Sequence, residues 1–254
     1  MIDGSKRAVP AQAADRLIVA LDVPTVREAR ELVAKLDGVA SFFKLGPWLL
    51  CAEGLDLFLD ELIAKRGKRV FWDCKLYDIG ETVKQGVARA AERGISLITV
   101  HGDEAIMRAA VEGRGSSTLM VFAISVLTSL HDEGLRQLGY MVPLDDLIRL
   151  RVRNAVSCGC DGIVASAQDN PTEIRRLAGS ESLLIATPGI RPAGTALHDH
   201  RRSGTPAAAI ASGADYLVVG RPITQHDDPA AQATRIIEEM QSAIGGGASQ
   251  GHPS

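Results

Sequence analysis

Three charged side chains that could act on one substrate lie close together in the chain, at Asp73, Lys75 and Asp78. They follow an apolar, aromatic run at residues 70–72, which predicts a strand that becomes a loop before Asp78. Alternate residues of a strand point to the same side, so Asp73 and Lys75 should share one face. Buried charge must be paired, so the cluster is either a structural ion pair that closes a barrel or a catalytic set. An ammonium among carboxylates stays charged, which suits proton donation.

Eight short apolar runs alternate with amphipathic segments and would position these charges. The predicted strands cover residues 17–21, 41–45, 69–74, 95–100, 118–124, 162–166, 183–186 and 216–220. Such runs are typical of strands buried on both faces of a parallel sheet. Eight strand–helix units predict an α/β protein that closes into a (β/α)8 TIM barrel. An open doubly wound sheet is the weaker alternative, because no Gly-x-Gly-x-x-Gly follows the first strand.

The segments between the strands carry helix signals. Thr25 and Glu28 have the spacing of a capping box, and apolar residues follow at helical spacing. Further helices are expected over residues 47–64, 82–93 and 144–157. No composition break divides the chain, so we expect one catalytic domain. Its predicted boundaries are a flexible N-terminal tail at 1–14, a barrel at 15–244 and a disordered, Gly-rich tail at 245–254.

The carboxyl ends of the strands should surround the active site of such a barrel. The polar residues expected there are Asp22, Lys44, Asp73, Lys75, Asp78, His101, Thr128, Gln168, Arg191 and Arg221. The first three strands contribute two acidic and two basic side chains in alternation, which is harder to explain structurally than one buried pair. We interpret the histidine and the glutamine of this set as supports of the barrel mouth.

The last two predicted strands carry a second signal, for an anion. A Thr-Pro-Gly-Ile-Arg stretch at 187–191 follows one strand, and Gly-Arg-Pro-Ile at 220–223 follows the next. Barrel enzymes frequently bind phosphate with these two loops. Gly189 and Gly220 would let backbone N–H groups approach an anion, and Arg191 and Arg221 would add bidentate donors. The pattern therefore predicts a phosphate-bearing ligand.

Composition excludes several other classes of protein. The 254 residues carry a formal net charge of −3, so the chain has no excess of positive charge of the kind that binds nucleic acid. No apolar run reaches the length of a membrane span and no signal peptide is evident, so we expect a cytoplasmic protein. Cys158 and Cys160 match no common zinc spacing and are expected to be buried free thiols.

Several motifs in order resemble the bacterial type of the orotidine 5'-phosphate decarboxylase family. They are Ala-Leu-Asp at 20–22, Asp-x-Lys-x-x-Asp-Ile at 73–79, Leu-Thr-Ser at 127–129, Ser-Ala-Gln at 166–168, Thr-Pro-Gly-Ile-Arg at 187–191 and Gly-Arg-Pro-Ile-Thr at 220–224. The resemblance covers nearly everything except the tails. It implies a carboxy-lyase that converts orotidine monophosphate to uridine monophosphate and CO2 in pyrimidine biosynthesis, without metal or organic cofactor.

The resemblance also implies roles for individual residues. Lys75 would stabilise and protonate the C6 carbanion, beside Asp73, while Lys44 and Asp22 contact the ribose. Asp78 and Thr82 would reach the active site of a second subunit, which implies a homodimer with shared sites. Thr128 would touch the pyrimidine. The implied phosphate-binding residues are Arg191, His200, Gly220 and Arg221.

Two departures from the family pattern accompany this resemblance. Gly80-Glu81 stands where the family usually has Pro-Asn, and His200 stands where it usually has glutamine. A neutral imidazole still donates one hydrogen bond. Two alternative functions remain: a metal-dependent sugar-phosphate lyase on the same barrel, and a catalytically silent phosphate-binding barrel. The lyases usually carry glutamate at the position of Lys44, whose ammonium would repel a metal, and a silent barrel should have lost part of the charge set.

Overall fold

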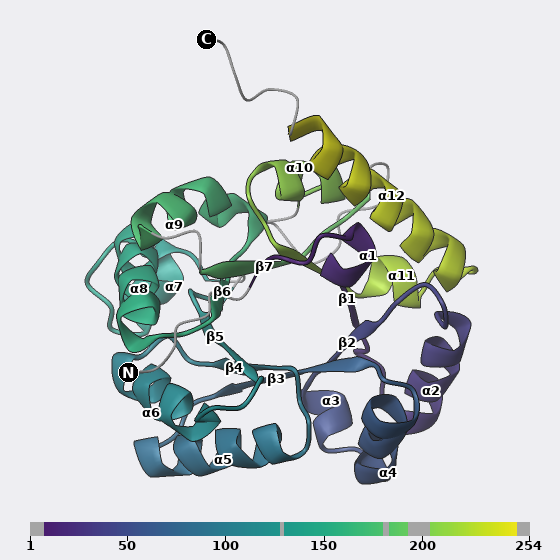
Figure 1. The fold of residues 1–254 in the computed structure, drawn as a ribbon. Coiled ribbons are helices and arrows are strands. Elements are labelled where there is room, and N and C mark those ends of the chain that lie inside the picture. The colour runs from purple at the N-terminus through teal and green to yellow at the C-terminus, as the bar shows by residue number, and fades with distance from the viewer. Residues whose placement is uncertain (1–7, 128–129, 180–182, 193–203, 248–254) are drawn as a thin grey trace.

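The computed structural model describes residues 8–127, 130–179, 183–192 and 204–247, and within them eight parallel strands close into a barrel (Figure 1). The strands are β1 Leu17–Ala20, β2 Phe42–Leu45, β3 Arg69–Leu76, β4 Leu97–Val100, β5 Met120–Ile124, β6 Gly162–Val164, β7 Leu184–Pro188 and β8 Tyr216–Val219. Each pairs with its neighbours in sequence, and β8 pairs with β1. The predicted (β/α)8 TIM barrel is confirmed.

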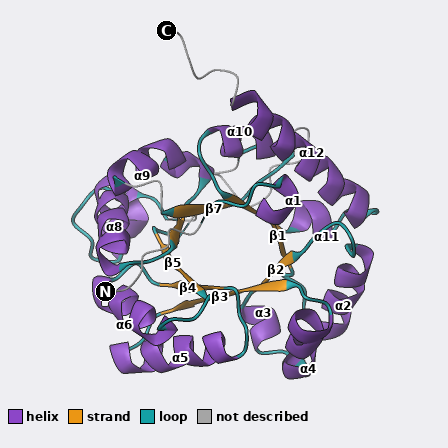
Figure 2. Ribbon diagram, in the orientation of Figure 1, coloured by secondary structure: helices purple, strands orange, loops and turns teal. Residues whose placement is uncertain are grey.

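Helices form an outer ring around the strands (Figure 2). They are α2 Val26–Lys35, α3 Pro47–Leu50, α4 Leu55–Asp60, the π-helical turn η1 Glu61–Lys65, α5 Gly80–Glu92, α6 Glu104–Arg114, α7 Asp132–Gln137, α8 Leu144–Cys158, the 3-10 turn η2 Ala167–Asp169, α9 Pro171–Ala178, α10 Pro206–Ala211, α11 Arg221–Thr224 and α12 Pro229–Gly247. As predicted, Thr25 caps α2, where its hydroxyl accepts a hydrogen bond from the Glu28 N–H at 3.2 Å.

The helical region expected over residues 47–64 is present, and it is interrupted in the middle. The segment is divided into α3, α4 and η1. Gly54 lies between α3 and α4 with φ of 80°, a left-handed conformation that glycine adopts without steric cost. The apolar periodicity of the segment is helical throughout, and it does not register this local reversal of the backbone.

Side chains of the strands alternate between two cores. Ile18, Phe42 and Phe71 belong to the core inside the barrel, whereas Leu17 and Phe43 pack against the helices. Two positions further along each strand, the side chain on the same face is small or charged: Ala20 on β1, Lys44 on β2 and Asp73 on β3. The inward-facing side chains therefore fill the barrel interior with apolar groups and place charged groups at the carboxyl ends of the strands, at the barrel mouth.

Both predicted tails are partly helical. The short helix α1 Ala13–Arg16 precedes β1, and Arg16 is buried: its Nε donates to the Asp215 carbonyl and its Nη2 to the Ala214 carbonyl, each at 2.8 Å. At the other end, α12 continues to Gly247, past the predicted boundary at 244. The Arg16 guanidinium thus satisfies two carbonyl groups directly before β8, and these hydrogen bonds hold α1 against the barrel.

Two further expectations concern the cysteines and the membrane. Cys158 and Cys160 are buried and free, as predicted. Burial raises the pKa of both thiols, so neither is an activated nucleophile. Among the described helices, none is both long and apolar enough to cross a membrane.

Candidate active site

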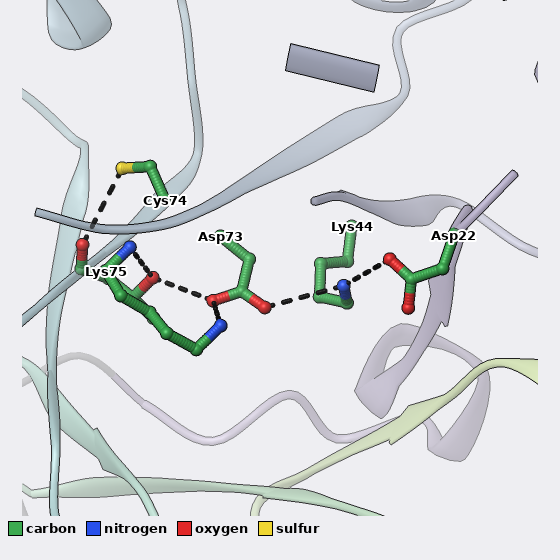
Figure 3. A network of polar contacts seen from close by, with 6 residues as sticks. Asp22, Lys44, Asp73, Cys74 and Lys75 are labelled. Atoms are coloured by element: carbon green, nitrogen blue, oxygen red, sulfur yellow. Dashed lines mark hydrogen bonds and ion pairs between the residues drawn. The ribbon is translucent and has the colours of Figure 1, made fainter. Parts of the chain in front are cut away.

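Four side chains of alternating charge form a chain of ion pairs at the mouth of the barrel (Figure 3). Lys44 Nζ lies 2.8 Å from Asp22 Oδ1 and 3.4 Å from Asp73 Oδ2. The other oxygen of Asp73, Oδ1, accepts a hydrogen bond from Lys75 Nζ at 2.8 Å. The sequence predicted that these four residues converge, and their positions in the structure agree with that expectation.

Exposure differs sharply along this chain of charges. The side chains of Lys44 and Asp73 are 9% and 13% exposed, whereas Lys75 is 39% exposed. Burial alone would raise the pKa of the Asp73 carboxyl. The two neighbouring ammonium groups, together with hydrogen bonds from Lys75 and Thr99, outweigh burial and hold the pKa of Asp73 below its ordinary value. Asp73 is therefore a buried, ionised anchor, and Lys75 is the ammonium that a ligand can reach.

A cavity of about 590 Å³ opens above these charges. It is lined by Ala20, Asp22, Lys44, Pro47, Trp48, Asp73, Lys75, Pro188, Gly189, Ile190, Arg191, Val218, Gly220, Arg221, Thr224 and Gln225. Strands β1 to β3 supply the charge set, and the ends of β7 and β8 supply both predicted glycines and both predicted arginines. The cavity thus joins an alternating charge array to an arginine- and glycine-lined wall suited to an anion.

Other predicted site residues lie elsewhere. Asp78 and Thr82 are exposed and do not line the cavity of their own chain, and the Asp78 carboxylate accepts a hydrogen bond from the Ile79 N–H at 2.7 Å. Neither His101 nor Gln168 lines the cavity. Thr128 and His200 lie outside the described residues.

Several residues near the cavity were missed by sequence reasoning. Trp48 lines the cavity although it is 64% exposed, and Gln225 lines it from just after α11. Thr99, fully buried on β4, donates a hydrogen bond to Asp73 at 2.9 Å. The pattern of charged residues at strand ends does not indicate neutral side chains, or residues that lie about one helical turn beyond a strand. Pro47, at the first position of α3 and separated from the end of β2 by Gly46 alone, was the available signal for Trp48.

The donor set fits an ammonium better than a metal ion. Within the described residues, no three His, Cys, Asp or Glu side chains are grouped as metal ligands. Lys44 Nζ occupies the place between Asp22 and Asp73 where a bridging cation would have to bind. The carboxylates of the site are therefore neutralised by the chain's own lysines.

Comparison with known proteins places this architecture in a family. The model of the family described as "Orotidine 5'-phosphate decarboxylase / HUMPS family" matches residues 15–236. An orotidine 5'-phosphate decarboxylase of Rhodopseudomonas palustris (strain BisA53) is 47% identical over 92% of this chain and 98% of its own length. The enzyme of that name from Methylorubrum extorquens (strain PA1) is 48% identical over 90% of this chain and 97% of its own length.

A solved structure agrees with the sequence comparisons. The crystal structure of orotidine 5'-phosphate decarboxylase from Lactobacillus acidophilus superposes with a TM-score of 0.78 at 30% identity, covering 89% of this chain and 99% of that one. The match therefore includes the barrel and the loops that carry the charge array, not an isolated motif. This chain belongs to the orotidine 5'-phosphate decarboxylase / HUMPS family.

Proposed function

We propose that this protein is an orotidine 5'-phosphate decarboxylase, a carboxy-lyase that converts orotidine monophosphate to uridine monophosphate and CO2 in pyrimidine biosynthesis. The observation that carries the proposal is the Asp22–Lys44–Asp73–Lys75 array beside the arginine-lined wall of one cavity. The names of the relatives support the same activity. The substrate is a water-soluble nucleotide, and the proposed compartment is the cytoplasm.

The proposed substrate pose follows from the charges that line the cavity. Arg191 and Arg221, with backbone N–H groups near Gly220, hold the phosphate at the β7–β8 side. Asp22 and Lys44 bind the ribose hydroxyls. This arrangement leaves the pyrimidine toward β3, with its C6 atom near the reachable ammonium of Lys75. Binding energy from the remote phosphate contributes to transition-state stabilisation at C6.

The chemistry requires no organic cofactor in this proposal. The bond between C6 and the carboxylate carbon breaks, CO2 leaves, and the electron pair of that bond remains on C6. The fixed ammonium of Lys75 stabilises this developing anion and then donates a proton from Nζ to form the new C6–H bond. Lys75 regains a proton from solvent. Asp73 is positioned near the departing carboxylate and keeps Lys75 oriented through its 2.8 Å hydrogen bond.

We also propose a homodimer with shared active sites. Asp78 and Thr82 are exposed and do not line the cavity of their own chain, which suits residues that serve a neighbouring pocket. Asp78 is flanked by two large apolar side chains, Tyr77 and Ile79, that are 67% and 73% exposed. A second copy that covered these two side chains would bury this apolar surface and bring the Asp78 carboxylate to the active site of the second copy.

The assay that tests the proposal uses the purified wild-type protein and orotidine monophosphate, followed by the loss of its ultraviolet absorbance. We expect turnover that is unchanged after EDTA treatment and dialysis, because Lys44 occupies the centre of the carboxylate set. Activity that disappears with EDTA and returns with Mg²⁺ would favour the metal-dependent sugar-phosphate lyase. No turnover of any nucleotide would favour the silent phosphate-binding barrel.

Gly46 provides a test of the Asp22–Lys44 pair without altering either charge. A Cβ at this position would lie 2.8 Å from Asp22 Oδ1 and 3.3 Å from Lys44 Nζ. The backbone at Gly46, with φ of −92°, accepts alanine, so the added methyl group acts by displacing the Asp22 carboxylate and by crowding the Lys44 ammonium. We expect Gly46→Ala to lower kcat/KM at least about tenfold, equivalent to about 1.4 kcal/mol, with little change in the thermal midpoint.

The matched control is Gly245→Ala, since a Cβ at Gly245 meets nothing within 4 Å. This variant should retain wild-type kcat/KM. If Gly46→Ala were as active as Gly245→Ala, turnover would not depend on the observed geometry of the ion pair between Asp22 and Lys44.

A further inference from the structure

We propose that Thr99 is a positioning residue that fixes the geometry of Asp73 and Lys75 through its side-chain hydroxyl; the inference rests on the proposed decarboxylase function. Thr99 lies on β4, is fully buried and does not line the cavity, so it has no direct access to a substrate. Its role is carried by three observations: the hydrogen bonds of its hydroxyl, the irregular pairing of β3 with β4, and the backbone conformation of Lys75.

The hydroxyl of Thr99 makes two hydrogen bonds whose direction is fixed by the partners. Its Oγ1 accepts from the backbone N–H of Lys75 at 3.1 Å and donates to Asp73 Oδ1 at 2.9 Å. An amide N–H can only donate and an ionised carboxylate can only accept, so the hydroxyl has one possible orientation. A single buried group thus joins the backbone of one functional residue to the side chain of the other.

The strand pairing leaves these two residues without regular support from β4. Trp72 pairs with Ile98 and Leu76 pairs with Val100, so residues 73–75 of β3 lie opposite Thr99 alone. A regular ladder would place one residue there, and the two extra residues form a bulge that re-aims side chains. Within this irregular stretch the Lys75 N–H donates to the Thr99 hydroxyl. The side chain of Thr99 therefore supplies a hydrogen bond to the backbone of β3 where the pairing with β4 is irregular.

Lys75 itself has a backbone conformation that requires such support. Its φ is 48°, in the left-handed region that residues with a Cβ rarely adopt. Conformations of this kind persist where surrounding contacts over-determine them, and they gather at functional sites. The hydrogen bond to the Lys75 N–H is one such contact, and it is made at the residue whose ammonium must reach C6.

The second hydrogen bond orients the Asp73 carboxylate. Its Oδ1 is shared by Thr99 Oγ1 and Lys75 Nζ, which leaves Oδ2 toward Lys44 Nζ at 3.4 Å (Figure 3). The charged and polar groups that face Asp73 are thus Lys44 from β2, Lys75 from β3 and Thr99 from β4. The hydroxyl also favours the ionised form of Asp73, so its removal should raise the pKa of this carboxyl.

The experiment compares Thr99→Val, which keeps the shape and loses the hydroxyl, with Thr99→Ser, which keeps the hydroxyl. For Thr99→Val we expect kcat to fall about 100-fold with KM changed less than about threefold, because misplacement of a reacting group by about 1 Å has effects of this size. The acid limb of the kcat–pH profile should move to higher pH as Asp73 becomes easier to protonate. Thr99→Ser should recover kcat to within about tenfold of wild type.

A purely structural threonine would give a different result. Its loss would lower the thermal midpoint, reduce kcat only in proportion to the folded fraction, and leave the acid limb in place. Wild-type kcat with an unmoved acid limb in Thr99→Val, or a serine variant no better than valine, would overturn the proposal.

A readout that does not depend on turnover separates this inference from the proposed function. Lys75 is partly exposed, so its acylation by a small amine-reactive ester can be followed by peptide mass spectrometry in wild type and both variants. We expect faster labelling of Lys75 in Thr99→Val, by at least about threefold, and near wild-type labelling in Thr99→Ser. If wild type fails to decarboxylate orotidine monophosphate but this pattern is found, only the proposed function fails; equal labelling in all three proteins refutes the positioning role.

Discussion

Replacing Lys75 with alanine should nearly abolish turnover while leaving the fold and nucleotide binding intact. The ammonium is proposed to act twice, first by stabilising the C6 anion and then by donating its proton. Electrostatic stabilisation by one group contributes about 10²–10³-fold and general acid catalysis about 10²–10⁴-fold, so we expect Lys75→Ala to lower kcat by at least about 10⁴-fold. The binding of uridine monophosphate should change much less, because the charge is required mainly in the transition state.

The surroundings of Lys75 explain why the variant should fold. Its side chain is 39% exposed, and Asp73 keeps the ammonium of Lys44 at 3.4 Å when Lys75 is removed. Lys35→Ala is the control, since Lys35 is an exposed residue of the outer helix α2 and does not line the cavity. Calorimetry with uridine monophosphate measures binding, and a stopped assay measures turnover. Substantial residual kcat in pure Lys75→Ala would contradict the role of this lysine as the proton donor.

The sequence predicted the elements of the barrel because each local rule agreed with the global fold. Continuous apolar runs indicated the strands, and alternation along β1, β2 and β3 carried an apolar interior up to Asp22, Lys44 and Asp73. Such consistency between local pattern and tertiary structure is what makes a fold readable from sequence. The same logic placed Gly220 and Arg221 at the cavity wall, because the loops after the last two strands of a barrel meet there.

The geometry around Lys75 could not be predicted in the same way. A regular strand was expected to place Asp73 and Lys75 on one face, and the two side chains do meet. The backbone reaches this arrangement by a bulge opposite Thr99 and a left-handed residue at Lys75. Period-two reasoning assumes an unbroken ladder, so it gives no sign of an insertion that depends on a neutral side chain of the next strand. Local rules fail here at the site of the proposed chemistry.

The proposed sharing of the active site between two subunits makes the second large prediction, which concerns Asp78. This residue follows the strand that supplies Lys75, yet it is exposed and outside the cavity of its own chain. Because Asp78 is proposed to complete the cavity of a second subunit, we expect Asp78→Asn to be nearly inactive although its own chain retains the complete Asp22–Lys44–Asp73–Lys75 array. Lys75→Ala and Asp78→Asn should each show almost no turnover when assayed alone.

Mixing these two inactive proteins should restore activity if the sites are shared. In a mixed dimer, one pocket receives both lesions, and the other receives intact Lys75 from one chain and intact Asp78 from its partner. Random re-association makes half of the dimers mixed, each with one complete pocket of two, so turnover should recover to about a quarter of wild type. The control mixes Lys75→Ala with Asp73→Asn, whose lesions both lie in the cavity of their own chain, so that every pocket stays defective. Subunit exchange is verified with differently tagged chains, and an unrecovered Lys75→Ala and Asp78→Asn mixture would assign Asp78 to its own chain's site.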